Sequence, residues 1–583
     1  MALLTFVRAI TPSALGPNKG QKDETRRSAM TSRQRAAERS LDNQNHTLPK
    51  GQVVLVFSSL ALALLVAFID QNGIGVTLPT IARDLHAEDT ISWAGTSSLI
   101  ANAAFQMLYG RLSGLFGRKV VYLAAISCLA TAALLCGFSQ NDTMFYVFRG
   151  IAGIGGGGLI NLSMIIVSDV VALEERGYYM GFLGSFVGLG NVVGPFLAAA
   201  FITRSSWRAF FWTTAALAAV LGGISLYTLP LGLPTRNFKE NARKIDYGGV
   251  LLSTTGIISL LIPISGGGAY FPWASPMVIT MLVLGSLSLL LFIVWEWKIA
   301  KLPMIPMEVF RSPDVSILLG LNFLLGSAYQ ALLYYLPLYL QNARQYSVMQ
   351  SAGIVAVPVG AQAVASVLSG NYISRVKRWK EVILTGFLLW TLGAGLMPAY
   401  KRGTSVGAII GPLVIAGIGI GFSFQPLLIA LQTHATKSRR AVIISSRNFF
   451  RCVGGAAGLA ISAAILQAVL KKNLPTNYQY LANNAYSPPR VEGPDAEAVY
   501  EAYMAASRAV FVLQAPLVAI CVVGCGFLTD HGLYSLEEQD EEIVSGGSTR
   551  ETDVESGEKA AATPNSLSDG SKVVAGEGGS HPS

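Results

Sequence analysis

The sequence predicts an all-α, polytopic membrane protein. Hydrophobic residues make up 52% of its 583 residues and charged residues only 13%. A soluble globular protein carries about 25% charged residues. The mean hydropathy is +0.48, and apolar runs recur, each close to the roughly 20 residues that a helix needs to cross the hydrocarbon core of a bilayer.

The apolar runs predict fourteen transmembrane helices. In chain order they lie near 52–72, 92–112, 120–138, 144–168, 178–201, 209–229, 247–266, 275–296, 313–340, 348–370, 381–399, 405–432, 440–470 and 508–529. Basic polar connections divide them into a six-helix bundle over 51–229, a linker with two extra helices over 230–312, and a second six-helix bundle over 313–529. The polar tails, 1–50 and 530–583, are predicted to be disordered.

Cations between the helices predict the orientation. If the N-terminus is cytoplasmic, the inside connections hold about twice as many Lys and Arg residues as the outside ones, as cytoplasmic loops do. Omitting one helix would invert the pattern downstream of it, so both tails are predicted to be cytoplasmic. The net charge of +9 is thereby explained without a nucleic-acid partner.

Several functions are disfavoured by what the sequence lacks. The five cysteines all lie in apolar runs, where they resemble small buried hydrophobic residues and not a disulfide framework or metal site. The sequence contains no phosphate-binding loop and no HExxH motif. An enzyme, a cofactor and direct ATP coupling are therefore not expected, and any work must come from an ion or substrate gradient.

The connection between the second and third helices is short, basic and rich in glycine. Gly110 and Gly117 would let the helix ends approach closely and turn tightly. Arg118 and Lys119 would hold the connection at the cytoplasmic face. We call residues 110–119 the gating loop, although an ordinary basic loop is an alternative interpretation.

Charged side chains at membrane depth are costly and usually face a cavity or a partner. Asp70 and Arg149 are the main candidates for function, with a purely structural ion pair as the alternative. Arg447 and Arg451 lie one helical turn apart and either act in transport or extend to the cytoplasmic surface. Glu296 lies near a helix end and is expected to contact only water.

Small and polar residues mark further helices. The glycine run after Arg149 would allow close helix packing. Gly190, Gly194 and Pro195 in the fifth helix, with Asn191 beside them, predict a closely packed, bendable helix at a domain interface. Candidate substrate-cavity residues are polar side chains within helices, which alternatively form hydrogen bonds between helices: Asn72, Gln106, Asn322, Gln330 and Gln425.

Five motifs in order resemble one family. The motifs are Phe68-Ile69-Asp70-Gln71-Asn72, the gating loop, Arg149-Gly150 with the glycines after it, Gly190-Asn191-Val192-Val193-Gly194-Pro195, and Tyr334-Tyr335-Leu336-Pro337-Leu338-Tyr339-Leu340-Gln341. Together they resemble the major facilitator superfamily and, within it, the fourteen-helix drug:proton antiporter branch. The resemblance covers about residues 50–530 and implies two six-helix bundles plus two extra central helices.

The resemblance also implies a function. It implies proton-coupled export of small, largely apolar organic compounds such as drugs, toxins or secondary metabolites, by alternating access to a site between the halves. Arg149 would couple protons, Asp70 would be protonated, and the fifth helix would favour antiport. A monomer in the plasma membrane is expected. The alternative is uptake, or transport across the vacuolar membrane, of a specific solute such as an amino acid or siderophore.

One departure from the family pattern lies in the gating loop. Gly114 stands where the family has an acidic residue that pairs with cations and helps to close the cytoplasmic side. Either another acid substitutes, with Asp169 and Glu174 as the candidates, or the conformational balance has shifted.

Overall fold

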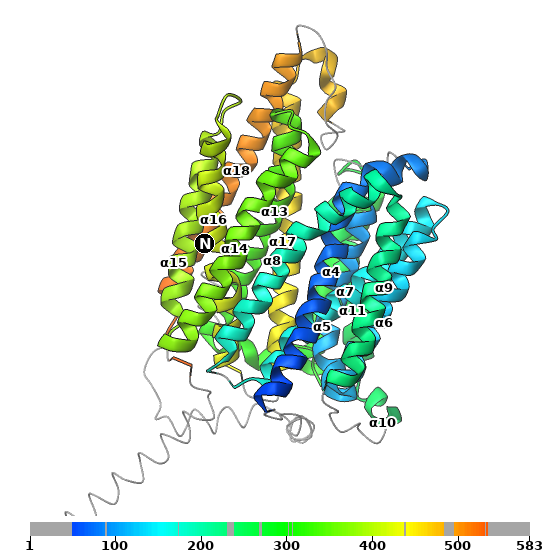
Figure 1. Cartoon of the computed structure of the whole chain (residues 1–583), viewed down its shortest axis with the longest axis vertical. Coiled ribbons are helices and arrows are strands. Elements are labelled where there is room, and N and C mark those ends of the chain that lie inside the picture. The colour runs from blue at the N-terminus through cyan, green and yellow to red at the C-terminus, as the bar shows by residue number, and fades with distance from the viewer. Residues whose placement is uncertain are drawn as a thin grey trace, which may run out of the picture. The chain divides into compact units, whose positions relative to one another are not determined.

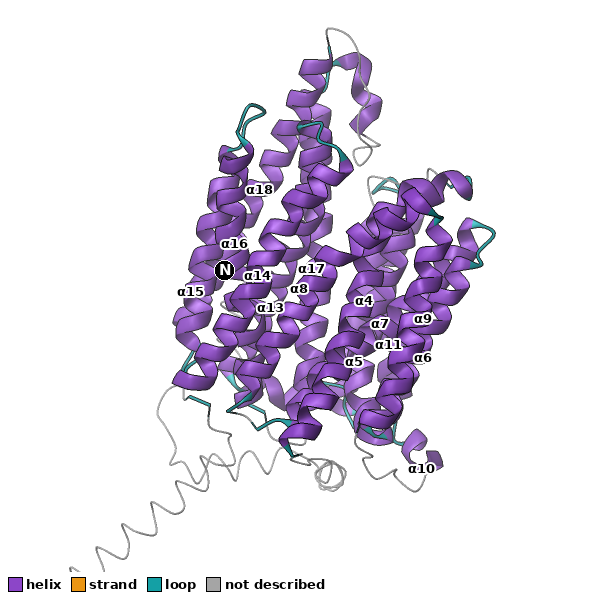
Figure 2. Ribbon diagram, in the orientation of Figure 1, coloured by secondary structure: helices purple, strands orange, loops and turns teal. Residues whose placement is uncertain are grey.

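The structure is a computed structural model that describes residues 49–533, except 88–89, 92, 173, 230–237, 267–270, 301, 306, 436–438, 483–494 and 531. Within these residues the chain is helical and contains no β-strand (Figure 2). The predicted disordered tails lie almost wholly outside the described residues.

The first part of the described chain forms α4 (Lys50–Asp84), α5 (Trp93–Phe116), α6 (Arg118–Gly137), α7 (Asp142–Val170), α8 (Arg176–Arg204) and α9 (Trp207–Thr228). A short helix, α10 (Phe238–Arg243), then leads to α11 (Tyr247–Gly266) and α12 (Pro276–Lys298).

The remaining part forms a 3-10 turn, η2 (Met307–Arg311), then α13 (Pro313–Leu338), which continues into a π-helical segment, η3 (Tyr339–Ala343). Then follow α14 (Val348–Val376), α15 (Lys380–Leu396) with η4 (Met397–Ala399), α16 (Val406–Thr433), α17 (Arg440–Asn473), η6 (Thr476–Ala482) and α18 (Ala496–Gly526).

Fourteen of these helices contain 17 or more residues. Thirteen of them are long and apolar enough to cross a membrane. The remaining one, α5, carries polar side chains that are buried against other helices, among them Asn102, Gln106 and Arg111. The prediction of an all-α polytopic membrane protein is therefore confirmed.

Two predicted helix ends were wrong. The first helix continues to Asp84 and not to 72, because Asp70 and Asn72 find partners on other helices and need not end the helix. The last helix begins at Ala496 and not at 508. Its first turns carry acids that suggested a loop, yet Glu497 pairs with Arg402 while Val499 is buried.

The helices pack in two sets (Figure 1). Helix α11 packs against α12 and also contacts α5 and α17. In the first set, α4 packs against α8 and α9, while α7 packs against α5 and α6. In the second, α13 packs against α17 and α18, while α16 packs against α14 and α15. The two sets meet where α8 contacts α14 and where α5 contacts α17.

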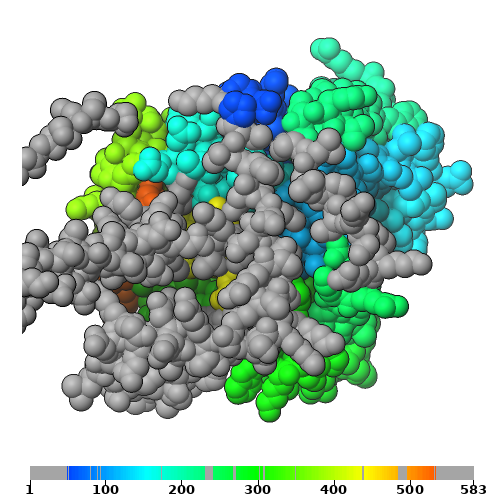
Figure 3. All heavy atoms as spheres, turned by 90° about the horizontal axis from the view of Figure 1, so that it is seen from below, coloured from blue at the N-terminus to red at the C-terminus, as the bar shows by residue number. Residues whose placement is uncertain are grey.

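Small residues allow the two helix sets to pack closely at these contacts. A Cβ atom on Gly181 of α8 would lie 2.5 Å from the backbone oxygen of Ser366 on α14, and one on Gly370 would lie 2.1 Å from the backbone oxygen of Gly177. A Cβ atom on Gly110 of α5 would lie 2.4 Å from Ser445 Oγ on α17. Figure 3 views this end from below, with the blue start of α4 at its surface. The sets therefore contact each other at the end that carries the gating loop.

Candidate functional site

Asp70 and Arg149 form a buried ion pair. Arg149 Nη1 donates to Asp70 Oδ2 at 2.8 Å, which joins α7 to α4, and the Arg149 side chain is 0% exposed and the Asp70 side chain 4%. Arg149 Nε also donates to the backbone oxygen of Ala94 at 3.4 Å, and its guanidinium lies 5.8 Å from the ring centre of Phe211. The structure thus brings together the two charges that the sequence singled out.

This ion pair leaves one hydrogen-bonding atom on each side unused. Asp70 Oδ1 and Arg149 Nη2 are buried and have no hydrogen-bond partner among the described residues. A buried polar atom without a partner is costly. The site therefore has unused capacity to accept a proton on the carboxylate and to donate a further hydrogen bond from the guanidinium.

The gating-loop residues also lie together. Gly117 has a φ of 90°, a backbone conformation that glycine adopts readily, and it turns the chain from α5 into α6. Arg118 Nε lies 2.8 Å from Asp169 Oδ2 at the end of α7, and its Nη1 donates to Ser113 Oγ at 2.6 Å. Lys119 Nζ donates to the backbone oxygen of Leu229 at 3.1 Å, after α9.

Both acids proposed to replace the missing acid at Gly114 have cationic partners. Asp169 pairs with the gating-loop arginine, as described. Glu174 instead pairs with Lys377 at 3.0 Å, across the contact between α8 and α14, and is 71% exposed. Asp169 therefore supplies the buried carboxylate at the gating loop, whereas Glu174 reinforces the other contact between the two sets.

The fifth predicted helix, α8, lies against α4. A Cβ atom on Gly190 would lie 2.7 Å from Phe68 Cβ, and one on Gly194 would lie 2.9 Å from the backbone oxygen of Ile69. Pro195 lies inside the helix. Asn191 accepts a hydrogen bond from Asn72 Nδ2 at 2.7 Å and donates one to Tyr329 Oη at 3.2 Å on α13. This hydrogen-bond chain links α4, α8 and α13.

The predicted cavity residues differ in their surroundings. Asn322 is fully buried and occupied, because its Oδ1 accepts from Arg447 and its Nδ2 donates to Leu318. The side chains of Gln106 and Gln425 are buried, and their amide oxygens have no hydrogen-bond partner among the described residues. Gln330 is half-buried near Gly455 of α17.

Arg447 does not extend to the surface, so that alternative was wrong. It is 0% exposed and donates to Asn322 Oδ1 at 2.9 Å, to Asn448 Oδ1 at 2.8 Å and to the backbone oxygen of Phe424 at 2.7 Å. Arg451 is half-buried, and the two guanidinium groups lie 5.5 and 5.7 Å from the Phe424 ring centre. Neither arginine forms an ion pair with a carboxylate of the described residues.

Polar residues outside the five candidate cavity residues connect α7 with α17. Asn161 Nδ2 donates to Ser445 Oγ at 2.8 Å, and Asn448 Nδ2 donates to Asn161 Oδ1 at 3.2 Å. Asn448 directly follows Arg447. Its position next to a charged residue within an apolar run was the sequence feature that could have identified it.

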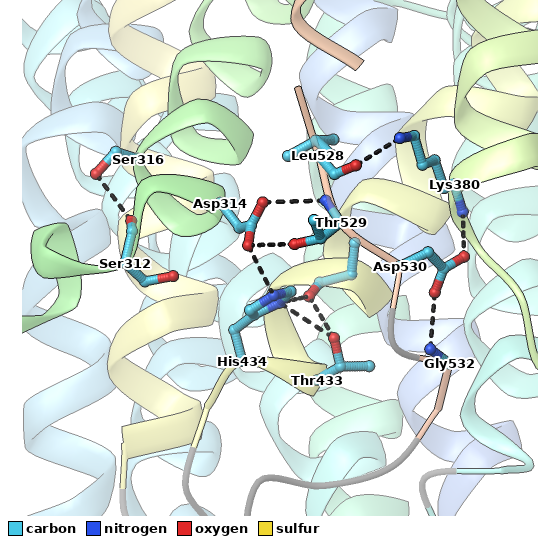
Figure 4. A network of polar contacts seen from close by, with 11 residues as sticks. Ser312, Asp314, Ser316, Lys380, Thr433, His434, Leu528, Thr529, Asp530 and Gly532 are labelled. Atoms are coloured by element: carbon cyan, nitrogen blue, oxygen red, sulfur yellow. Dashed lines mark hydrogen bonds and ion pairs between the residues drawn. The ribbon is translucent and has the colours of Figure 1, made fainter. Parts of the chain in front are cut away.

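A second polar network fixes the chain after α18 (Figure 4). Asp314 accepts hydrogen bonds from the backbone nitrogen and hydroxyl of Thr529 at 3.1 and 2.7 Å, and its Oδ2 lies 3.9 Å from His434 Nε2. Asp530 accepts from the backbone nitrogens of Trp379 and Lys380, both at 3.0 Å. The network ties the starts of α13 and α15 and the end of α16 to the segment that leaves α18.

Comparison with known proteins decides the family. The family model described as Major Facilitator Superfamily matches residues 60–459. The chain belongs to this superfamily. It is therefore a multi-pass membrane transporter, and transporters of this superfamily are not enzymes. The resemblance seen in the sequence motifs is confirmed.

Fungal members of the superfamily are similar over most of their length. Citrate exporter 1 of Yarrowia lipolytica is 45% identical over 507 residues, which cover 86% of this chain and 75% of the relative. Efflux pump dotC of Dothistroma septosporum is 30% identical over 431 residues, which cover 74% of each chain.

Solved superfamily structures share the fold. The human organic anion transporter MFSD10 aligns with a TM-score of 0.54 at 16% identity, covering 81% of this chain and 100% of that one. The proton:xylose symporter XylE aligns with a TM-score of 0.56 at 13% identity, covering 85% and 99%.

Proposed function

We propose that this chain is a proton-coupled exporter of small organic compounds that works by alternating access. The observation that carries the proposal is the fully buried ion pair between Asp70 and Arg149. We place the transporter in the plasma membrane as a monomer with both termini in the cytoplasm, and the vacuolar membrane is the alternative location.

The coupling follows from the cost of an unpaired buried charge. Protonating Asp70 would remove the negative charge that balances Arg149, and breaking a buried pair in this way costs about 3–5 kcal/mol. A conformation that gives Arg149 water or another partner would then be favoured. A proton thus binds the two conformations with different affinity, which is what coupling requires.

The contacts between the two helix sets support a state closed at the cytoplasmic side. Gly110 lies against Ser445, Gly181 lies against Ser366, and Lys377 pairs with Glu174. With the gating loop placed in the cytoplasm, these contacts close the inner side. Export would require them to separate so that substrate can enter from the cytoplasm.

The arginines of α17 favour an organic carboxylate as substrate. Arg447 and Arg451 place two positive charges one turn apart, and buried charges are normally paired. The carboxylates of a bound substrate could supply the missing negative charge. The 45% identity to a fungal protein named as a citrate exporter supports this substrate class.

A second candidate is the export of largely apolar metabolites. The aromatic ring of Phe424 lies beside the same arginines, and relatives named as efflux pumps support this candidate. Aromatic surfaces bind apolar compounds through the hydrophobic effect.

The test is accumulation in a transporter-depleted yeast that expresses the full chain. Cells are loaded with labelled citrate or with fluorescent apolar compounds, with and without a protonophore. We expect lower accumulation that a protonophore abolishes and that Asp70→Asn loses, with Glu381→Gln on the exposed face of α15 as the matched control. Higher accumulation, or compound trapped in the vacuole, would instead support uptake or vacuolar transport.

A further inference from the structure

The two extra helices hold a pair of carboxyl groups that the proposed transport site does not use. Asp246 directly precedes α11, and Glu296 lies in the last turn of α12. A Cβ atom on Gly249 would lie 2.4 Å from Asp246 Oδ2 and 2.9 Å from Glu296 Oε1. These two oxygens therefore face the same small space beside the Gly249 backbone.

Each carboxyl group uses one oxygen and leaves the other without a partner. Asp246 Oδ1 accepts from the backbone nitrogen of Gly249 at 3.0 Å and from Trp295 Nε1 at 2.8 Å. Glu296 Oε2 accepts from the backbone nitrogen of Ile305 at 3.2 Å. The facing oxygens, Asp246 Oδ2 and Glu296 Oε1, are buried and have no hydrogen-bond partner among the described residues.

Two ionised carboxylates in this place would be costly. Glu296 is only 2% exposed, so the prediction that it contacts only water was wrong. A second carboxylate facing it would add repulsion between the two negative charges. A single proton between the facing oxygens would give both of them a hydrogen bond and remove one of the two negative charges.

The other charged groups around the pair fit one remaining negative charge. Arg111 of α5 is buried and donates to Pro303, two residues before the Ile305 nitrogen that donates to Glu296, while Lys244, two residues before Asp246, is exposed. The part of α17 that packs against α11 presents Phe449 and Cys452. Arg111 thus balances one carboxylate, and a second ionised carboxylate would have no further buried cation beside it in the part of the chain that the structure describes.

We propose that Asp246 and Glu296 share one proton, and that this proton fastens the end of α12 to the start of α11 and to the gating loop. The connection to the gating loop runs through residues 303–305. Arg111 Nε donates to the backbone oxygen of Pro303 at 2.7 Å, and Ile305, two residues later, donates to Glu296.

Water can approach the pair from the end of the molecule that carries the gating loop. A hollow lined in part by Arg111, Lys244, Asp246 and Met304 lies beside it. When the pH on this side rises and the proton is lost, two negative charges meet beside Gly249. We expect the end of α12 and residues 302–305 then to loosen from α5. The two extra helices α11 and α12 are thereby attached to the gating loop by a contact that depends on the proton.

Two amide substitutions test the shared proton without removing the packing. Glu296→Gln and Asp246→Asn each keep the oxygen that accepts the observed hydrogen bonds. Each also turns the facing oxygen into an amide nitrogen that donates to the other carboxylate. Both variants should therefore fold, and Glu381→Gln on exposed α15 is the matched control.

The first measurement is the infrared spectrum of the purified full chain in detergent at neutral pH. We expect a carbonyl band of a protonated carboxyl group that is lost in Glu296→Gln and in Asp246→Asn and kept in the control. A band that is unchanged in both amide variants would show that the pair holds no proton, and would overturn the proposal.

The second measurement is the apparent melting temperature between about pH 5 and pH 8. The folded pair keeps a proton that the unfolded chain releases above the ordinary carboxyl pKa of about 4, so the wild-type stability falls as the pH rises. Each amide variant should lose the part of this slope that one proton causes. An equal slope in wild type and both variants would contradict the proposal. Neither readout needs a transported substrate, so the result is independent of the role of Asp70.

Discussion

Arg118 Nε lies 2.8 Å from Asp169 Oδ2, so the arginine of the gating loop is paired with the end of α7. The side chains are only 18% and 7% exposed, which makes the pair stronger than a surface salt bridge. Gly114 carries no side chain that could take this role. A charge-assisted contact at the gating loop is therefore present between two helices of the first set, although the usual acid is missing.

We expect Asp169→Asn to loosen the gating loop. The asparagine keeps the shape but removes the negative charge, so Arg118 loses a charged hydrogen-bond partner worth about 1–3 kcal/mol. The apparent melting temperature of the purified protein should fall. Glu174→Gln is the matched control, because that acid is exposed and its removal should cost less than about 1 kcal/mol. Equal effects of the two variants would show that Asp169 has no special role.

The glycine run of α7 offers a matched pair of substitutions. A Cβ atom on Gly153 would lie 2.1 Å from the backbone oxygen of Ser98, whereas one on Gly156 would meet nothing within 4 Å. We expect Gly153→Ala to destabilise the protein by about 1–3 kcal/mol through overpacking. Gly156→Ala should stabilise it by up to about 1 kcal/mol, because alanine favours the helix. Melting temperatures that move in the same direction in both variants would contradict this packing.

The sequence predicted the Asp70 site better than the carboxyl pair, for a physical reason. A charge inside an apolar run needs a partner, so Asp70 and Arg149 are conspicuous from their sequence neighbours alone. Asp246 and Glu296 lie at helix ends, where a charged residue normally contacts water. Their burial depends on how α11 and α12 pack against each other and on the return of residues 302–305, which no local pattern specifies.

The ends of helices show the same limit. Hydropathy located the apolar centres of the helices, but it could not show that Glu497 would pair with Arg402 and allow α18 to begin at Ala496. The partners of Asn322 were equally hidden. Its position in an apolar run suggested a cavity or a helix contact, and only the packing shows that Arg447 occupies it.

Acid should weaken the end of the protein opposite the gating loop. The hydrogen bond from Arg208 holds the pKa of the Asp84 carboxyl below its usual value. The ionised Asp84 carboxylate therefore stabilises the folded protein fully above about pH 4, the ordinary carboxyl pKa in the unfolded chain. This stabilisation is lost as the pH falls through the lower pKa that Asp84 has in the folded protein. The side chain is 45% exposed, so we expect less than about 1 kcal/mol. Asp84→Asn should flatten the acid side of the melting-temperature profile, and an unchanged profile would contradict this assignment.

The buried pair of α4 and α7 should separate stability from coupling. Asp70→Asn leaves the Arg149 charge unpaired, and we expect a loss of about 3–5 kcal/mol. Adding Arg149→Gln removes the second charge and should recover most of the stability, although protonophore-sensitive transport stays lost. As controls, Glu381→Gln and Arg378→Gln at the exposed ion pair should each cost less than about 1 kcal/mol of stability. A double variant as unstable as Asp70→Asn alone would contradict charge burial as the cause.

The half-buried arginine of α17 should decide between the two substrate classes. Arg451 Nε is buried without a hydrogen-bond partner among the described residues, and Arg447 beside it is already occupied by neutral acceptors. If a substrate carboxylate binds there, Arg451→Gln removes a charged hydrogen bond worth about 1.5–3 kcal/mol. Export of labelled citrate from expressing cells should then fall roughly tenfold or more, while export of uncharged apolar dyes stays within about twofold. The surface variant Arg378→Gln controls for the loss of a positive charge, and the melting temperature checks folding. An equal loss for citrate and for the dyes would show that the arginine supports the fold and not carboxylate recognition.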